Sequence, residues 1–245
     1  MTGRQPYRSR YDSARLRRSA GLSVLFVGLL WWIRLLESLF GWDFTGLGVY
    51  PLHVAGLIGV LTAPLVHASF QHLFSNTLPL LILGTFLLYV YPRSARFAVP
   101  AIWLGSGLGV WLTARPAYHI GASGLATGLM CYLFLLGMLR RDRRAVAFGM
   151  LTFFLYGGML WGIFPHEPDV SYESHFWGAV MGLAMAVLLF RYDPPPAERR
   201  YRWEEETEDV DDPLIGDLWK QARGPERPAP GSDPDDSSGD ESAER

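Results

Sequence analysis

The feature that most constrains this chain is a series of apolar blocks, each about 20 residues long, that contain almost no charged side chains. At a helical rise of 1.5 Å per residue, about 20 residues cross the roughly 30 Å hydrocarbon core of a bilayer. Six such blocks occur, at residues 21–40, 72–91, 97–113, 121–139, 145–164 and 174–190. The sequence therefore predicts an all-α polytopic membrane protein, a bundle of six transmembrane helices.

Charged residues are divided unevenly along the chain. Residues 1–190 contain 14 basic and 7 acidic residues, whereas residues 191–245 contain 8 basic and 17 acidic residues. The apolar blocks and the single cysteine, Cys131, disfavour a water-soluble enzyme, a nucleic-acid binder and a secreted disulfide scaffold. Three parts are expected: a basic cytoplasmic arm at residues 1–19, a six-helix transmembrane domain at residues 20–191, and an acidic, disordered cytoplasmic tail at residues 192–245.

The loops between the blocks predict the orientation of the chain in the membrane. The amino-terminal arm, the connections at 92–96 and 140–144 and residues 191–202 after the last block hold 16 basic residues, whereas the opposite loops contain Arg115 and little else. By the positive-inside rule, both termini face the cytoplasm of a multi-pass protein in the cell membrane. In the longest loop, the apolar stretch Val54–Val66 is too short to cross and is expected to be interfacial or re-entrant.

Three polar side chains inside the blocks are expected at one depth. Polar groups are costly in a bilayer, so each needs a partner or a function. Counted from the nearest cytoplasmic arginine, Ser123 and Asn76 lie 17 residues away and His175 lies 16 residues away. At 1.5 Å per residue, all three lie about 24 to 26 Å above the inner boundary. This level is close enough to the outer surface for a cavity to admit water.

Small residues allow the fourth and sixth blocks to approach closely. Gly124 and Gly128 form a small-xxx-small pair, and small residues repeat every four positions in the sixth block, at Ser174, Gly178, Gly182 and Ala186. His175 shares a helix face with Gly178 and Gly182. A hydrogen bond between Ser123 and His175 is therefore expected across this seam.

A serine at a helix start beside a histidine is the minimum for nucleophilic acyl transfer. The imidazole takes the hydroxyl proton, and backbone N–H groups at the helix start can face the developing oxyanion. Asn76 and His72, one helical turn apart, could add side-chain donors. No acid is expected at this level, so a Ser-His dyad fits better than a Ser-His-Asp triad.

Three motifs in this order resemble those of the rhomboid intramembrane serine proteases, over roughly residues 21–190. They are His67-x4-His72-x3-Asn76, Gly121-x-Ser123-Gly124 and His175-x2-Gly178-x3-Gly182. The resemblance implies a serine-type endopeptidase with Ser123 as nucleophile and His175 as general base. It implies His72, Asn76 and the Ser123 N–H as the oxyanion hole, with His67 and the four motif glycines in support. It also implies cleavage of transmembrane segments of other membrane proteins, with no metal or cofactor.

Two segments depart from the pattern of the resembled family. Many rhomboids have a Trp-Arg pair in the first external loop, where this chain has Gly56–Thr62. An aromatic residue is common one turn after the nucleophile, where it packs on the histidine ring, and this chain has Thr127.

Two other functions remain as alternatives. One is a catalytically weak or inactive rhomboid-like protein that binds membrane helices for quality control or trafficking; such a protein would be free to lose Ser123 or His175. The other is a small transporter, which would need polar groups continuing toward the inner side of the bundle. A metal site with His119 or His166 is disfavoured because no pair at ligand spacing occurs.

Overall fold

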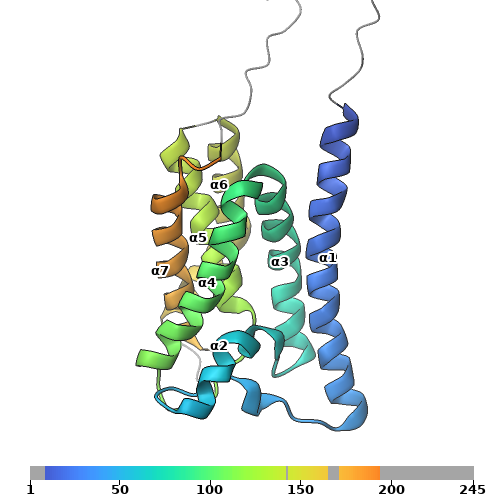
Figure 1. Ribbon diagram of the computed structural model, residues 1–245, viewed down its shortest axis with the longest axis vertical. Coiled ribbons are helices and arrows are strands. Elements are labelled where there is room, and N and C mark those ends of the chain that lie inside the picture. The colour runs from blue at the N-terminus through green and yellow to red at the C-terminus, as the bar shows by residue number, and fades with distance from the viewer. Residues whose placement is uncertain (1–8, 142, 165–170, 194–245) are drawn as a thin grey trace, which may run out of the picture. The chain divides into compact units, whose positions relative to one another are not determined.

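The computed structural model describes residues 9–141, 143–164 and 171–193, which are mainly helical (Figure 1). Residues 1–8 of the basic arm and residues 194–245 of the acidic tail lie outside the described residues. Six longer helices form the bundle: α1 (Ser9–Phe40), α3 (Phe70–Val90), α4 (Pro92–Thr113), α5 (Ser123–Arg140), α6 (Arg143–Tyr156) and α7 (Tyr172–Leu189). The prediction of an all-α polytopic membrane bundle is confirmed.

Each of the six longer helices corresponds to one of the six predicted blocks. Among the described residues, α1 from residue 13 onward, α3, α4 and α5 are long and apolar enough to cross a membrane. The fifth block is α6 followed by the 3₁₀ segment η4 (Gly157–Ile163), and the sixth is the 18-residue α7. Since α1 begins at Ser9, its helix extends back into the basic arm.

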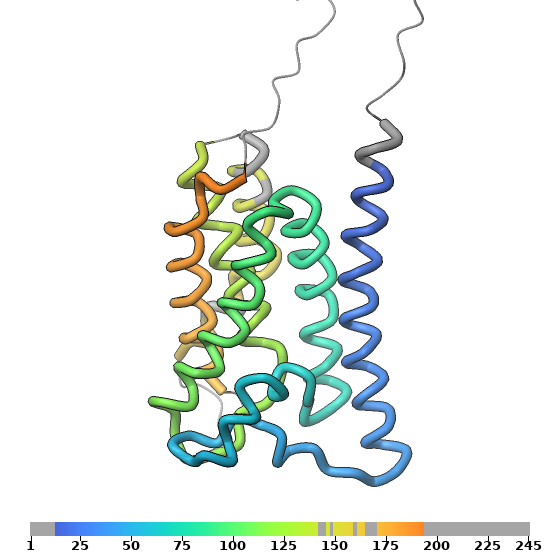
Figure 2. The backbone as a smooth tube through the Cα atoms, in the orientation of Figure 1, coloured from blue at the N-terminus to red at the C-terminus, as the bar shows by residue number. Residues whose placement is uncertain are grey.

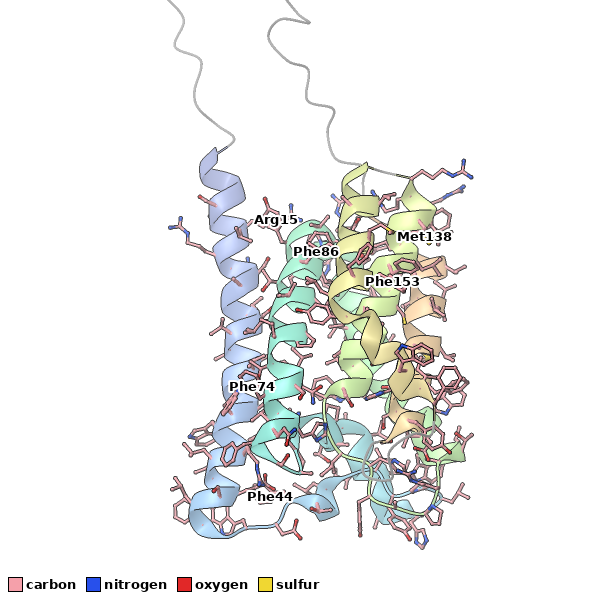
Figure 3. The ribbon with its side chains drawn as sticks, turned by 180° about the vertical axis from the view of Figure 1, so that it is seen from behind. Arg15, Phe44, Phe74, Phe86, Met138 and Phe153 are labelled. Atoms are coloured by element: carbon pink, nitrogen blue, oxygen red, sulfur yellow. The ribbon has the colours of Figure 1, made fainter. Side chains whose placement is uncertain are left out.

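Three of these helices begin at the same end of the bundle, where the loop between α1 and α3 also lies. In Figures 1 and 2, α3, α5 and α7 start at this end, and α1, α4 and α6 run in the opposite direction. Figure 3 shows Arg15 and Phe86 near the end where α1 begins and Phe44 at the other. The polar motifs of the sequence lie at the starts of α3, α5 and α7, so the topology gathers them at one end.

The centre of the bundle is α5, which packs against α7 through backbone contacts. A Cβ added at Gly178 would lie 2.1 Å from the carbonyl oxygen of Gly124, and one at Gly182 would lie 2.1 Å from that of Gly128. Contacts this short leave room only for glycine, so the two backbones touch along the expected seam. The seam fixes the position of α7 against the start of α5.

The loop between α1 and α3 contains short helices and covers the start of α5. Its apolar stretch forms η2 (Val54–Ile58), α2 (Gly59–Thr62) and η3 (Ala63–Leu65), preceded by η1 (Thr45–Leu47). These helices are too short to cross the bilayer, as the sequence indicated. Val49 exchanges both backbone hydrogen bonds with His119, and the Gly121 N–H donates to the Ala63 carbonyl at 2.9 Å. The loop is thereby attached to the segment that leads to Ser123.

The opposite end of the bundle is held by a buried carboxylate. Asp193, just after α7, accepts the backbone N–H groups of Arg93 and Ser94 at 3.0 and 2.9 Å and so caps the start of α4. Arg140, at the end of α5, donates to the carbonyl oxygens of Phe190 and Asp193. These bonds join the ends of α5 and α7 to the start of α4.

Candidate active site

Ser123 is the first residue of α5, and no side chain caps this helix. The N-cap residue is Ala122, which has no side chain able to accept the N–H groups of the first turn. By contrast, Ser69 caps α3 and Ser171 caps α7 with their hydroxyls. The first N–H groups of an α-helix have no partner within the helix and carry its positive end. The start of α5 is therefore able to receive a negatively charged oxygen beside the Ser123 hydroxyl.

Two histidines from the start of α3 lie against the turn that leads into Ser123. A Cβ added at Gly121 would lie 2.5 Å from Cε1 of His72, and Gly121 has a φ of +110°. Both the contact and the left-handed backbone require glycine at this position. The rings of His67 and His72 meet edge to face, with centroids 5.1 Å apart. The first two motifs of the sequence are thus in direct contact.

His67 is almost completely buried and holds the residue before the nucleophile. Its Nε2 accepts the backbone N–H of Ala122 at 3.4 Å, and Nδ1 has no partner in the described part of the chain. Burial, together with the nearby His72, lowers the pKa of His67 to about 3. The ring is therefore neutral at physiological pH, as an acceptor nitrogen requires.

His175 lies in the first turns of α7, against the 3₁₀ segment η4. A Cβ added at Gly162 would lie 2.2 Å from Nδ1 of His175, so the Gly162 backbone packs directly on the ring. The Nδ1 atom is buried and has no hydrogen-bond partner among the described residues. The hydrogen bond expected between the Ser123 hydroxyl and the His175 ring is not formed in these described segments, because the seam brings together their neighbours Gly124 and Ser174 instead. The two residues are held near each other by their neighbours, since Gly124 packs on the backbone of Ser174.

Asn76 is buried one turn after His72. Its side-chain Nδ2 donates to the backbone carbonyl of His72 at 3.2 Å, within the same helix. An amide group has two N–H donors, so one remains for another acceptor. The role of Asn76 and His72 as oxyanion donors stays a prediction.

Sequence reasoning missed a buried acid at this end of the bundle. Glu173 is 6% exposed and lies two residues before His175, although no acid was expected at this level. Its carboxylate does not form a triad with His175: it faces Arg115 and His119, at 3.7 and 3.9 Å. The signal available was Ser171 followed by Glu173 just before an apolar run, because a serine N-cap and an acid in the first turn are typical of a helix start.

The two departures from the rhomboid pattern have different outcomes. Thr127 is fully buried, and its hydroxyl has no partner among the described residues. Gly162, which the motifs did not indicate, instead supplies a surface for the His175 ring. The segment Gly56–Thr62 packs on an earlier part of its own loop through Gly59, where a Cβ would lie 2.2 Å from the backbone of Gly48. Close backbone packing therefore holds this segment against the first part of the loop.

Metal ligands do not cluster in the described part of the chain. No group of three or more His, Cys, Asp or Glu side chains there could hold a metal ion. His119 is bound to Ser171 and to a backbone carbonyl, and His166 lies outside the described residues.

These observations define a helical membrane protein whose reactive side chains gather at the starts of three helices. The Rhomboid domain model matches residues 55–192, which include all three motifs. The chain belongs to the rhomboid family. Uncharacterized proteins of Mycobacterium bovis and Mycobacterium tuberculosis are each 38% identical to it over 179 residues, which cover 69% of this chain and 75% of theirs. One from Mycobacterium leprae is 35% identical over 180 residues, 69% of this chain and 71% of its own. No solved structure matches the chain.

Proposed function

We propose that this rhomboid-family protein is an intramembrane serine endopeptidase that cleaves transmembrane segments of other membrane proteins. The observation that carries the proposal is the position of the uncapped start of α5, where Ser123 is the first residue. This helix start lies beside His72, and it contacts α7 at Ser174, the residue before His175. A hydroxyl, an imidazole and unpaired N–H donors at one site are the groups that acyl transfer requires.

The reaction follows from these groups. Oγ of Ser123 attacks the carbonyl carbon of the scissile peptide bond, and His175 takes the hydroxyl proton. Since Nδ1 of His175 packs on Gly162, Nε2 is the nitrogen that acts as base. The peptide oxygen becomes an oxyanion that accepts N–H donors at the start of α5, with His72 and Asn76 as further donors. His175 then gives the proton to the leaving amine, and water hydrolyses the acyl ester in the reverse sequence of proton transfers.

The orientation of the protein follows from its charges. Most basic residues of the described segments lie near the start of α1 and in the α3–α4 and α5–α6 connections, at the end opposite the proposed site, where Figure 3 shows Arg15; Arg34 and Arg115 are the exceptions. With that end in the cytoplasm, the site lies near the outer surface of the cell membrane, and both termini are cytoplasmic. Substrates are then cut near the outer ends of their transmembrane segments.

A non-catalytic protein that binds membrane helices is the second candidate. The uncapped N–H groups at the start of α5, beside the Ser123 hydroxyl, favour catalysis over this alternative. Side chains that serve only to hold helices together gain by pairing, whereas catalytic groups keep atoms available for a substrate.

The decisive experiment is labelling of the purified protein with a fluorophosphonate serine probe, combined with cleavage of a model membrane-anchored substrate. We expect modification confined to Ser123, and we expect Ser123→Ala and His175→Ala to abolish cleavage. Ser75→Ala is the matched control, because Ser75 is exposed on α3 and its hydroxyl bonds only its own helix. Cleavage by a correctly inserted Ser123→Ala protein at the wild-type rate would refute the proposal and favour the binding protein.

A further inference from the structure

A buried polar cluster joins the segment before Ser123 to the start of α7. Its members are His119, Ser171, Ser174, Glu173 and the backbone of Arg115. His119 is 3% exposed and Glu173 is 6% exposed. Burying an imidazole and a carboxylate is costly unless both are paired, so the cluster needs an explanation.

The hydrogen bonds of this cluster can be followed from His119 to the first turn of α7. Nε2 of His119 lies 3.0 Å from the carbonyl oxygen of Arg115, which can only accept. In the neutral imidazole, Nδ1 is then the acceptor, and it takes the hydroxyl proton of Ser171 at 2.6 Å. Ser171 accepts in turn from the hydroxyl of Ser174 at 2.8 Å and from its N–H at 3.2 Å. The chain of bonds runs from the first turn of α7 to the loop before α5.

Glu173 attaches the same turn to the loop a second time. Its carboxylate accepts the backbone N–H of Arg115 at 3.3 Å and lies 3.7 Å from Nε of that residue. Its other oxygen lies 3.5 Å from the Ser171 hydroxyl oxygen, whose single proton points to His119. Negative charge in the first turn of a helix is stabilised by the helix dipole, so Glu173 suits this position in α7.

His119 and Ser171 are each close in the chain to one member of the proposed dyad. His119 lies four residues before Ser123, and Ser171 lies four residues before His175. The His119 backbone is itself fixed by its two bonds to Val49. One 2.6 Å hydrogen bond therefore connects two short arms, one leading to each member of the proposed dyad.

We infer that His119 and Ser171 are positioning residues whose mutual hydrogen bond sets the separation of Ser123 and His175. The effect that this inference expects on the reaction rate rests on the proposed function. The effect that it expects on the distance between Ser123 and His175 rests on geometry alone. The glycine seam holds α7 laterally against α5, and the His119–Ser171 bond fixes the outer end of α7, where His175 lies. A displacement of about 1 Å can cost about 100-fold in rate.

The kinetic test compares Ser171→Ala, Ser171→Thr and His119→Phe, together with the Ala and Phe double variant. Ser171→Ala and His119→Phe should each lower kcat and the rate of fluorophosphonate labelling by about 10- to 100-fold, with KM within about twofold. The double variant should lose less than the product of the two single losses, because both single variants remove the same His119–Ser171 bond. Ser171→Thr keeps the hydroxyl and should restore the rate. Ser94→Ala is the control: it removes a hydroxyl bond of a buried serine at the other end of the bundle and should leave kcat unchanged.

A second measurement reports the separation without any activity. In a Cys131→Ala background, Ser123→Cys with His175→Cys provides two thiols for a short bifunctional methanethiosulfonate cross-linker. Adding Ser171→Ala should slow cross-linking at least fivefold, whereas adding Ser94→Ala should not. Unchanged cross-linking in folded protein would overturn the inference. Slower cross-linking in a protein whose Ser123 no probe labels would support the inference while refuting the proposed function.

Discussion

Replacing Gly178 by alanine should separate the two helices that carry the proposed dyad. The new Cβ would lie 2.1 Å from the carbonyl oxygen of Gly124, where ordinary van der Waals contact needs at least 3.4 Å. Both atoms belong to helix backbones, so no flexible side chain can relieve the clash, and α5 and α7 must move apart by more than about 1 Å. Overpacking of this kind costs about 1 to 3 kcal/mol of unfolding free energy.

Gly178→Ala should also lower the rate of cleavage. Gly178 is three residues from His175, so the same displacement moves the imidazole away from Ser123. We expect kcat to fall by about 100-fold, because a 1 Å misplacement of a reacting group has that effect. The measurements are cleavage of the membrane-anchored substrate at saturating concentration and unfolding in a mixed-detergent titration.

The matched control for Gly178→Ala is Gly28→Ala in α1. A Cβ at Gly28 meets nothing within 4 Å, and both substitutions gain the same helix propensity of about 1 kcal/mol. Gly28→Ala should therefore leave the rate unchanged and the protein as stable as wild type or more so. If Gly178→Ala matched Gly28→Ala in both measurements, the backbone contact would not hold the site together.

Three further predictions address other parts of the bundle. His67→Gln should flatten the pH dependence of the unfolding free energy. The pKa of His67 in the folded protein, about 3, lies below the ordinary 6.5, so the wild-type protein loses up to about 1.4 kcal/mol of unfolding free energy per pH unit as the pH falls from 6.5 toward 3. The same pH dependence in both proteins across that range would contradict this prediction. Asp193→Ala should cost about 0.5 to 2 kcal/mol of unfolding free energy by removing the cap of α4, with kcat unchanged in the substrate assay. Asn76→Ala should reduce turnover by about 10- to 1000-fold while Ser123 still reacts with the probe, and unchanged turnover would show that Asn76 only holds its helix.

The fold could be predicted from the sequence because its main determinants are local. Apolar blocks of about 20 residues set the number of helices, and small residues at spacing four indicated the contact between α5 and α7. The same local signals placed Ser123, His175 and Asn76 at the starts of three helices that share one end of the bundle. The basic connections indicate orientation but not contacts between residues. The cap of α4 by Asp193 was therefore not predicted, since it joins residues about 100 positions apart in the chain.

The cluster around Glu173 was missed for a physical reason. A count of residues from the cytoplasmic arginines gives the depth of a residue in the membrane but not the side of the helix on which its side chain lies. The count also assigns a polar side chain at a helix start to the loop. Glu173 is buried because Arg115 and His119, more than 50 residues earlier, cover it. That contact depends on the loop between α4 and α5 folding back on α7, which no periodicity in the sequence predicts.

Gly121 and Gly162 contact the imidazole rings of the proposed site. This chain lacks the aromatic residue that the family pattern places one turn after the nucleophile, and these glycines restrain the rings instead. Each glycine presents bare backbone to a histidine ring, Gly121 to His72 and Gly162 to His175. A peptide group is flat and rigid, so it can restrain a ring as an aromatic face does, provided that no Cβ intervenes. The two glycines lie on different segments, one leading into α5 and the other ending the path from α6. The two histidine rings are therefore restrained by separate parts of the chain.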